Sequence, residues 1–503
     1  MAYYVTTPIY YVNGDPHLGH AYSTMAADVL ARHMRQRGED VFFLTGTDEH
    51  GEPIELAAEK EGISPQELAD RNAPKFEQMA HRIEATNDFF IRTSDPRHEA
   101  KVAEIMQIVH DNGHVYEGTY EGWYCPRGGE FYTERELGPG NTCPIHEIPL
   151  EREKEENWFF RLSSFQEQLE RLYEEHPDFV VPDFRRNEAV SFIKQGLEDV
   201  SLSRARLKWG MELPWDPSQR MYVWFDALLN YVTALSFARE GEDLTDRFWP
   251  ADYHVLAKDI LKFHAVIWPA LLIAAGYEPP KRMVIHGYLL MGEKKMSKSL
   301  GNVLDPYEVI DRFGADALRY YCFREVSFGQ DGSVSAAGFE TRYETELANE
   351  YGNLASRTLA MIDRYRDGVV PAGEVGPQLA ADFDGVVERV RDLLDQAELS
   401  QALEVIWKLV RRLNQYVEES RPWDLAKDES LAGDLDGVLY NLAEGLRVTT
   451  LLLHPYLPDS SVRLLDALGE TELGLAAAEL GSHKGGQRIE KLPPLFPKVE
   501  SPA

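Results

Sequence analysis

Two histidines near the start of the chain are spaced for a shared phosphate site. His17 and His20 frame the run His17-Leu18-Gly19-His20, which follows a strand-like segment and a loop. On a helix this spacing places both imidazoles on one face beside the positive N-terminal end, where an anion can dock. Gly19 has no side chain, so a flat base can lie against the backbone. Alone the motif is weak, because two such histidines are as readily solvated surface groups.

A cationic loop much later in the chain carries charges that suit a nucleotide reaction. Residues 292–302 place Lys294, Lys295 and Lys298 between glycines and hydroxyl side chains. Lys298 could neutralise charge that develops on an α-phosphate and pyrophosphate during an in-line displacement, with Lys295 assisting. Considered alone, the same lysines form an ordinary solvated basic turn.

The elements around the histidines predict a parallel sheet. Residues 3–12 are rich in β-branched and aromatic side chains, residues 13–16 contain Gly and Pro, and a helical pattern extends from 17 to about 38. Residues 41–46 have the pattern of a second buried strand. This order predicts a βαβ unit. Nucleotides bind beyond the carboxyl ends of such strands, which is where the histidine pair falls.

The rest of the chain predicts an insertion followed by helices. Residues 117–160 change to Gly, Cys, Tyr and Pro with short strand-like runs, which indicates a small inserted domain. Apolar alternation typical of strands returns at 221–225 and 253–256. From about residue 340 the pattern is nearly all helical, with a long amphipathic run over 384–419, and this predicts a helical bundle.

Length and composition indicate a globular protein of several domains. The 503 residues exceed the roughly 250 to 300 at which single hydrophobic cores stop growing. The most apolar stretch, 265–275, is shorter than the ~20 residues needed to span a bilayer. With only three cysteines, the chain is expected to be a soluble cytoplasmic protein without a membrane partner.

The formal net charge of −32 argues against broad, nonspecific binding of nucleic acid. Recognition of one folded RNA remains open if cations cluster locally, and residues 408–414 contain such a cluster on a predicted helix. Taken alone, that cluster is better interpreted as a solvated helix face.

Both signatures, in this order and separated by a return to a parallel sheet, resemble the paired signatures of class I aminoacyl-tRNA synthetases. Runs at 6–13, 46–51, 222–227 and 258–264 are similar to the methionyl-tRNA synthetase family, and the resemblance extends over roughly residues 1–430. It implies an enzyme that joins methionine to the α-phosphate of ATP, releases pyrophosphate, and transfers the methionyl group to the 3' end of tRNA(Met).

The resemblance also implies a methionine pocket. The family's pocket positions fall on Ile9, Tyr11, Asp48, Trp224, Ala227, Leu228, Tyr231, Ile260 and His264. Aromatic walls such as Trp224 suit a polarisable thioether, and the Tyr231 hydroxyl could donate to its sulfur. Asp48 would hold the ammonium group. Without the resemblance, the two aromatics would be core residues and Asp48 a loop cap.

For ATP, the family's positions fall on His17, Gly19, His20, Asp259 and Lys298, with Asp259 reaching the ribose. His17, His20, Lys295 and Lys298 form the expected catalytic set. Magnesium is implied as the partner of the ATP phosphates. The first step needs no general base, because the carboxylate of methionine is already an anion at neutral pH. Catalysis is expected to be positioning with charge stabilisation.

The resemblance places anticodon recognition on Asn353, Arg357 and Trp423. Asn353 and Arg357 have i,i+4 spacing and therefore share a helix face. Trp423 follows Pro422 and could stack on an unpaired base. Alone, each would be an ordinary helix residue or a core tryptophan.

We therefore expect an α/β fold in which a doubly wound, Rossmann-like catalytic domain is followed by an all-α bundle. The catalytic halves are 1–116 and 219–339, the second with the lysine loop and a stem, and the connective insertion is 117–218. Residues 340–503 form the helical anticodon-binding domain and a C-terminal tail whose role the sequence does not define. The chain ends soon after these helices, so a monomer is expected.

Three alternatives remain open. A nucleotidylyltransferase shares the His-x-Gly-His site. Such enzymes are usually short, however, and the long helical segment after residue 340 would then have no function. Another synthetase specificity, such as cysteine, leucine or valine, is disfavoured by Trp224, Tyr231 and His264 and by the lack of an evident large editing insertion. A non-catalytic tRNA-binding paralogue would be expected to lose signature histidines or lysines, and all are present.

The insertion contains a degenerate zinc knuckle. Cys125 and Cys143 each begin a short run where the family often supplies two pairs of zinc ligands, but Gly128 occupies the position of the second cysteine. Cys125, Cys143 and His146 remain, so a bound zinc would need a water or a carboxylate such as Glu130 as its fourth ligand. We favour a vestigial knuckle held by packing.

Metal analysis of the purified, tag-free protein tests this interpretation. An empty knuckle predicts zinc well below one ion per chain, because structural zinc is almost always held by four protein ligands. About one zinc per chain that is lost in the Cys143→Ser variant would contradict the vestigial interpretation.

Overall fold

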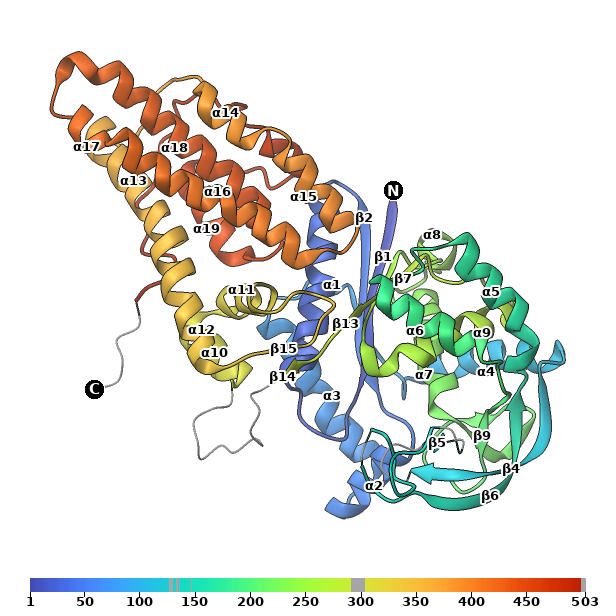
Figure 1. Cartoon of the computed structure of the whole chain (residues 1–503). Helices are drawn as coiled ribbons and strands as arrows, with labels where there is room; N and C mark the ends of the chain where they lie inside the picture. The colour runs from blue at the N-terminus through green and yellow to red at the C-terminus, as the bar shows by residue number, and fades with distance from the viewer. Residues whose placement is uncertain (126–129, 133, 135, 146, 291–303, 499–503) are drawn as a thin grey trace.

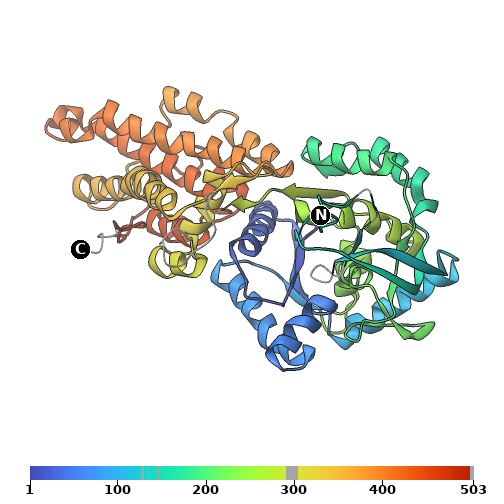
Figure 2. The same ribbon diagram turned by 60° about the horizontal axis from the view of Figure 1, so that its bottom comes forward.

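The computed structural model describes residues 1–125, 130–132, 134, 136–145, 147–290 and 304–498 (Figure 1). An α/β part and a long helical part lie side by side, and the view in Figure 2 shows the same arrangement. Gly128, His146, Lys294, Lys295 and Lys298 lie outside the described residues, as does the side chain of Glu130. Among the described residues, no helix is long and apolar enough to cross a membrane.

The α/β part is built on a six-stranded sheet in which every pair of neighbouring strands is parallel, with the order β3-β2-β1-β12-β13-β7. Val5 of β1 lies opposite Phe43 on one side and Tyr253 on the other. The strands are β1 (Ala2–Tyr11), β2 (Asp40–Asp48), β3 (Phe89–Arg92), β7 (Val180–Val181), β12 (Tyr253–Ala257) and β13 (Arg282–His286). The predicted βαβ unit is confirmed, with α1 (Leu18–Gln36) as its crossover helix.

Alternate residues of each strand enter two different hydrophobic cores. Tyr3 and Val5 of β1 pack in the core that contains α1, whereas Tyr4 packs in the core on the other face. The first face is covered by α1 and α3 (Pro65–Arg82) and the second by α4 (Pro96–Asp111), α7 (Val223–Thr233) and α9 (Trp268–Ala275). Because both faces are buried, the strands are mainly apolar, as in doubly wound sheets. The predicted fold class is confirmed.

One predicted strand is wrong. The apolar alternation at 221–225 indicated a strand, but β11 (Asp216–Met221) ends at Met221 and α7 begins at Val223. Nearly every residue of α7 is buried. A helix that is buried all round has no exposed polar face, so its pattern cannot be distinguished from a buried strand by periodicity alone.

The inserted region forms an antiparallel sheet with the order β5-β4-β6-β8. Its strands are β4 (Val115–Cys125), β5 (Glu130–Tyr132), β6 (Glu151–Phe160) and β8 (Val200–Ser201). Within the same range, α5 (Gln166–Glu175) and α6 (Asp183–Lys194) flank β7, which pairs with β13. The range 117–218 thus also returns one strand to the parallel sheet.

Both knuckle cysteines lie in a small core beside β5. Cys125 and Cys143 are buried with Tyr132 and Leu150, and the Cys143 thiol lies 3.4 Å from the Tyr132 hydroxyl. Where the structure describes side chains, no three His, Cys, Asp or Glu groups converge as a metal site would require.

The helical part confirms the predicted bundle but divides the amphipathic run 384–419. α15 (Val386–Asp395) and α16 (Leu399–Ser420) are separate helices, because Ala397 has a positive φ of 56° between them. The other helices are α10 (Pro306–Phe313), α11 (Ala315–Glu325), α12 (Ala336–Arg342), the π-helix η6 (Tyr343–Gly352), α13 (Asn353–Arg366), α14 (Pro377–Phe383), α17 (Pro422–Leu425), α18 (Ala432–Leu453) and α19 (Pro458–Leu468).

The stretch after α19 lies along the bundle. Arg447 of α18 donates to the carbonyls of Ala477 and Glu479 at 2.5 and 3.0 Å. Near the end of the described chain, the Tyr343 hydroxyl donates to the carbonyl of Pro497 at 2.8 Å. These contacts give residues 474–498 a structural role that composition did not predict.

Candidate active site

The histidine signature and Asp259 meet at the carboxyl ends of neighbouring strands. β1 leads into α1 and then to β2 on one side, while β12 lies on its other side, so the strand order reverses between β1 and β12. Ligands of open α/β sheets bind in the crevice at such a reversal. His17 follows β1 and Asp259 follows β12.

His17 and His20 form a reciprocal capping box at the start of α1. The Nδ1 atom of His17 accepts from the backbone N–H of Gly19 at 3.1 Å, and that of His20 accepts from the N–H of His17 at 3.1 Å. The rings stack with centroids 3.6 Å apart. A Cβ on residue 19 would lie 3.0 Å from the His17 ring, so Gly19 also makes room for the stack.

These hydrogen bonds fix which ring nitrogens carry protons. Each Nδ1 acts as an acceptor, so each neutral ring carries its proton on Nε2 and keeps that N–H for a ligand. Burial lowers the pKa of His17, and burial together with the nearby His17 lowers the pKa of His20 to about 3. At neutral pH the pair therefore supplies two neutral donors beside the helix N-terminus.

Asp259 lies close enough to His17 for the charge of each group to affect the pKa of the other. The Tyr288 hydroxyl bonds to Asp259. Lys258 lies 4.4 Å from the centre of the Tyr288 ring and 2.5 Å from Asp331. Lys258, Tyr288 and Asp331 were not predicted as site residues. Asp331 is distant in sequence and matches no motif that could have indicated it.

Most of the predicted methionine-pocket residues belong to the apolar core on one face of the parallel sheet. Ile9, Tyr11, Trp224, Leu228, Tyr231 and Ile260 belong to one apolar cluster, and Ala227 is buried on the same helix as Trp224. Trp224 stacks on Phe263 with centroids 3.9 Å apart and meets His264 edge to face at 6.1 Å. Phe263 is an aromatic wall that the sequence prediction omitted, although it lies within the quoted run 258–264.

The Tyr231 hydroxyl has a different hydrogen-bond partner from the predicted thioether. His264 Nδ1 lies 3.0 Å from the Ile260 carbonyl, which can only accept, so Nδ1 carries the proton. Burial lowers the pKa of His264 to about 4, and the neutral ring accepts at Nε2. Tyr231 therefore donates to that nitrogen at 2.8 Å, and only its oxygen lone pairs face other partners.

Asp48, at the end of β2, is buried and lies close enough to Tyr231 for its charge to add to the effect of burial in raising the pKa of that hydroxyl. Its Oδ1 atom has no hydrogen-bond partner among the described residues. Burial raises the pKa of Asp48 well above its usual value, and the charge of Asp226 raises it further. A cationic group that donates to Oδ1 would offset this cost, so the site fits an ammonium group.

A chain of buried polar groups lies behind Asp48. Asp226 bonds to His50 at 2.6 Å and to His98 at 2.8 Å, and His98 bonds to Thr233 at 2.7 Å. Burial alone would lower the pKa of His50, but the charge and hydrogen bond of Asp226 raise it to about 10. His50 and Asp226 stand in two quoted motif runs, yet their pairing depends on the fold and was not predicted.

The three predicted anticodon residues lie on two adjoining helices. The Arg357 guanidinium is 5.7 Å from the centre of the Trp423 ring and 2.9 Å from Glu418. Asn353 is exposed on the same helix as Arg357, and Trp423 is half-buried. The structure thus brings Arg357 and Trp423 into contact.

The cationic cluster at 408–414 is largely occupied by acidic partners. Arg411 pairs with Glu346 and Glu350, and Arg412 pairs with Asp382 and Glu419. The cluster therefore stabilises contacts within the bundle, which agrees with the interpretation as an ordinary helix face.

Known proteins are similar over nearly the whole chain. The family model described as "tRNA synthetases class I (M)" matches residues 3–149 and 141–359. A methionine–tRNA ligase of Caldanaerobacter subterraneus subsp. tengcongensis is 45% identical over 99% of this chain and 79% of its own length. A methionine–tRNA ligase of Streptomyces coelicolor is 44% identical over 99% of this chain and 97% of its own.

A solved structure shares the fold. It is titled Mycobacterium tuberculosis methionyl-tRNA synthetase in complex with methionyl-adenylate. Its TM-score to this chain is 0.94 at 41% identity, and the match covers 99% of this chain and 100% of that one.

The His50–Asp226 pair predicts a pH-dependent stability difference. Because the pKa of His50 is raised from 6.5 to about 10 on folding, the stability it contributes is fully present below about pH 6.5 and is lost as pH rises through about 10. The difference in unfolding temperature between the wild type and His50→Gln should therefore shrink from about pH 6 to about pH 10. The exposed His81→Gln serves as control, and an unchanged His50 difference across this range would contradict the assignment.

Proposed function

We propose a mechanism for this chain from its family and its geometry. The chain belongs to the class I tRNA synthetases for methionine, the methionine–tRNA ligases. It is an ATP-dependent ligase. It activates methionine with ATP to methionyl-adenylate and pyrophosphate and then transfers the methionyl group to tRNA(Met). The observation that supports the activation step best is the neutral, preorganised histidine pair at the strand-order reversal, beside a pocket with an unpaired carboxylate oxygen.

In the proposed first step, a methionine carboxylate oxygen attacks the α-phosphorus of ATP in line and pyrophosphate leaves. The Nε2–H groups of His17 and His20 would donate to ATP, a base would lie over Gly19, and Asp259 would receive the ribose. Lys298, with Lys295, would neutralise charge on the departing pyrophosphate. Magnesium would accompany the phosphates of ATP, and zinc in the knuckle is not required for this chemistry.

The proposed methionine site separates charge recognition from apolar recognition. Asp48 would accept from the ammonium group through its unpaired Oδ1. Trp224, Phe263 and the apolar residues around them would contain the thioether. Because Tyr231 donates to His264, we propose that it shapes the pocket wall and does not donate to sulfur.

We propose that residues 340–503 read the anticodon and that residues 1–116 and 219–339 perform the chemistry, with 117–218 as the connective insertion. Asn353, Arg357 and Trp423 would contact anticodon bases, and the Arg357–Trp423 contact supports a shared surface. Base stacking on an aromatic ring is a usual means of reading unpaired RNA. A cytoplasmic, monomeric enzyme is the form in which we expect this activity.

Amino-acid-dependent exchange of pyrophosphate into ATP tests the activation chemistry. Across the proteinogenic amino acids, exchange is expected with methionine alone. It should fall roughly 100- to 1,000-fold in Lys298→Ala, because one oriented charge that stabilises a transition state typically contributes that much. The exposed Lys194→Ala should match the wild type. Exchange with another amino acid would overturn the pocket assignment, and none from folded protein would favour a non-catalytic RNA-binding role.

Trp423→Ala tests the anticodon assignment. We expect charging of tRNA(Met) to fall at least about tenfold, because removing one stacking platform costs roughly 1 to 3 kcal/mol. Methionine-dependent pyrophosphate exchange should remain close to wild type, since Trp423 lies on α17 in the helical bundle, away from the parallel sheet (Figure 1). Equal loss of both activities would count against this role.

A further inference from the structure

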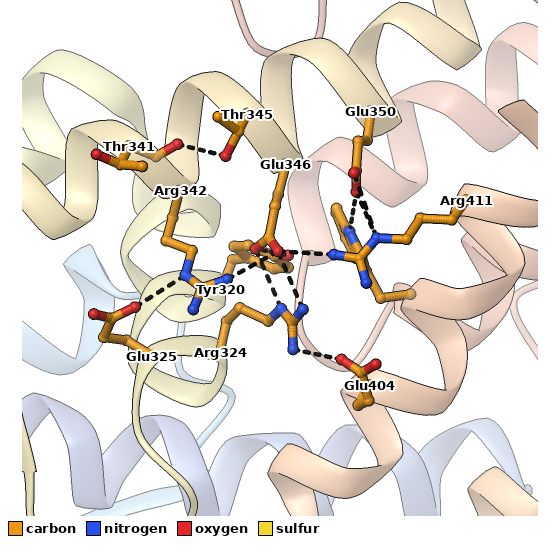
Figure 3. A network of polar contacts seen from close by, with 11 residues as sticks. Tyr320, Arg324, Glu325, Thr341, Arg342, Thr345, Glu346, Glu350, Glu404 and Arg411 are labelled. Carbon is orange, nitrogen blue, oxygen red and sulfur yellow. Dashed lines mark hydrogen bonds and ion pairs between the residues drawn. The ribbon is translucent and has the colours of Figure 1, made fainter.

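A single buried carboxylate accepts hydrogen bonds from four side chains in the helical part (Figure 3). Glu346 Oε2 accepts from the Tyr320 hydroxyl at 2.7 Å and from Arg324 Nε at 3.2 Å. Its Oε1 accepts from Arg324, Arg342 and Arg411 at 3.1, 2.9 and 3.0 Å. Glu346 is only 5% exposed. Burial alone would raise its pKa, but these donors lower it, so the carboxylate stays charged.

The donors come from separate helices. Tyr320 and Arg324 lie on α11, Arg342 on α12, and Arg411 on α16. Outer acids complete the network: Glu350 pairs with Arg411 and accepts from Trp407 Nε1 at 2.6 Å, and Glu404 pairs with Arg324 at 2.5 Å. Glu346 therefore joins three segments of the chain at one point.

Two of these segments continue into the proposed anticodon residues. α12, η6 and α13 follow one another without a break, so the helix that holds Glu346 goes on to Asn353 and Arg357. α16 leads directly into α17 with Trp423. The third segment, α11, packs against α1, whose N-terminal end carries His17 as its N-cap and His20 in its first turn. The network thus stands between both anticodon helices and the catalytic part.

Local geometry indicates that this point is specialised. Residues 343–352 form a π-helix of ten residues, whereas π-helical geometry usually occurs as single turns and often at functional sites. A buried charge needs all its partners in place, so removing one leaves the others poorly satisfied. The network therefore couples the positions of the three segments that supply its groups.

We propose that Glu346 is a positioning residue for tRNA charging: its network holds the helices of Asn353, Arg357 and Trp423 in register with α11 and the catalytic part. This rests on the proposed anticodon role of those residues. Glu346 itself touches neither substrate nor nucleotide in this assignment. Its loss should therefore misplace the anticodon contacts while the site of adenylate formation stays intact.

The test compares Glu346→Gln with the wild type on two RNAs, tRNA(Met) and the same tRNA with one anticodon base replaced. Glutamine has nearly the same shape as glutamate, but it carries no charge. Its amide N–H groups would also face guanidinium groups that are themselves hydrogen-bond donors. We expect kcat/KM for tRNA(Met) charging to fall about tenfold and the preference for the native anticodon to shrink by a similar factor. Methionine-dependent pyrophosphate exchange should stay within about twofold of wild type.

Glu325→Gln is the matched control, because Glu325 bonds Arg342 at 2.9 Å from outside the central carboxylate. It should retain both charging and anticodon preference. If Glu346→Gln does not fold, Arg411→Gln tests the same contact from α16, since the Arg411 side chain is 43% exposed and tolerates replacement better. Its anticodon preference should also shrink.

Trp423→Ala, measured beside these variants, separates the two hypotheses. If Trp423→Ala loses anticodon preference but Glu346→Gln and Arg411→Gln keep it, the positioning role is overturned and the anticodon assignment stands. If Trp423→Ala also keeps its preference, the anticodon assignment has failed and the inference fails with it. A variant that charges both RNAs more slowly by the same factor, with pyrophosphate exchange reduced equally, shows only general destabilisation and overturns the positioning role.

Discussion

The buried guanidinium of Arg319 is the contact on which the arrangement of the whole molecule depends. From α11 it donates to the carbonyls of Tyr456, Ile83 and Pro455 at 3.0, 3.0 and 2.7 Å, and it pairs with Asp28 of α1 at 2.7 Å. Both charged side chains are fully buried. Since an unpaired buried charge is very costly, these segments must assemble together. The helix that opens with the signature histidines is thereby fixed to the helical part.

In the proposed mechanism, the substrates supply the charges that complete the active site. Burial lowers the pKa of both signature histidines and keeps them neutral, and their Nδ1 atoms accept backbone N–H groups, which fixes the proton on Nε2. His50 balances Asp226, whereas Oδ1 of the neighbouring Asp48 has no hydrogen-bond partner among the described residues. An ammonium group at Asp48 and phosphates at the Nε2–H donors would complete the electrostatics. Groups already oriented before the substrates arrive need little reorganisation during the reaction.

Local pattern and motif spacing predicted the features that are local in the chain. The βαβ unit follows from residues 3–46, and the histidine pair from one tetrapeptide. What the sequence did not predict depends on partners brought together by the fold. The Tyr231 hydroxyl donates a hydrogen bond to His264 because the Ile260 carbonyl fixes the tautomer of the imidazole. Asp331 reaches Lys258 across a long sequence separation.

Two element boundaries were mispredicted for a related reason. The start of α7 at Val223 was hidden because a fully buried helix has the same apolar pattern as a buried strand. The break between α15 and α16 depends on one left-handed residue, Ala397, whose identity gives no signal of it. Alanine favours continuing a helix, so tertiary packing and not local propensity decides this boundary.

The positions of the arginines show how the formal net charge of −32 bears on RNA binding. Arg324, Arg342 and Arg411 surround Glu346, and Arg412 is held by Asp382 and Glu419, so these cations make no broad positive surface. A polyanion is then repelled by most of the molecule. Arg357 is itself paired with Glu418 while it lies over Trp423, so an RNA must offer contacts that compensate for that pair. In the proposed anticodon role, repulsion of RNA in general together with close contact at this one cation–aromatic surface would favour the cognate tRNA by disfavouring the wrong partners.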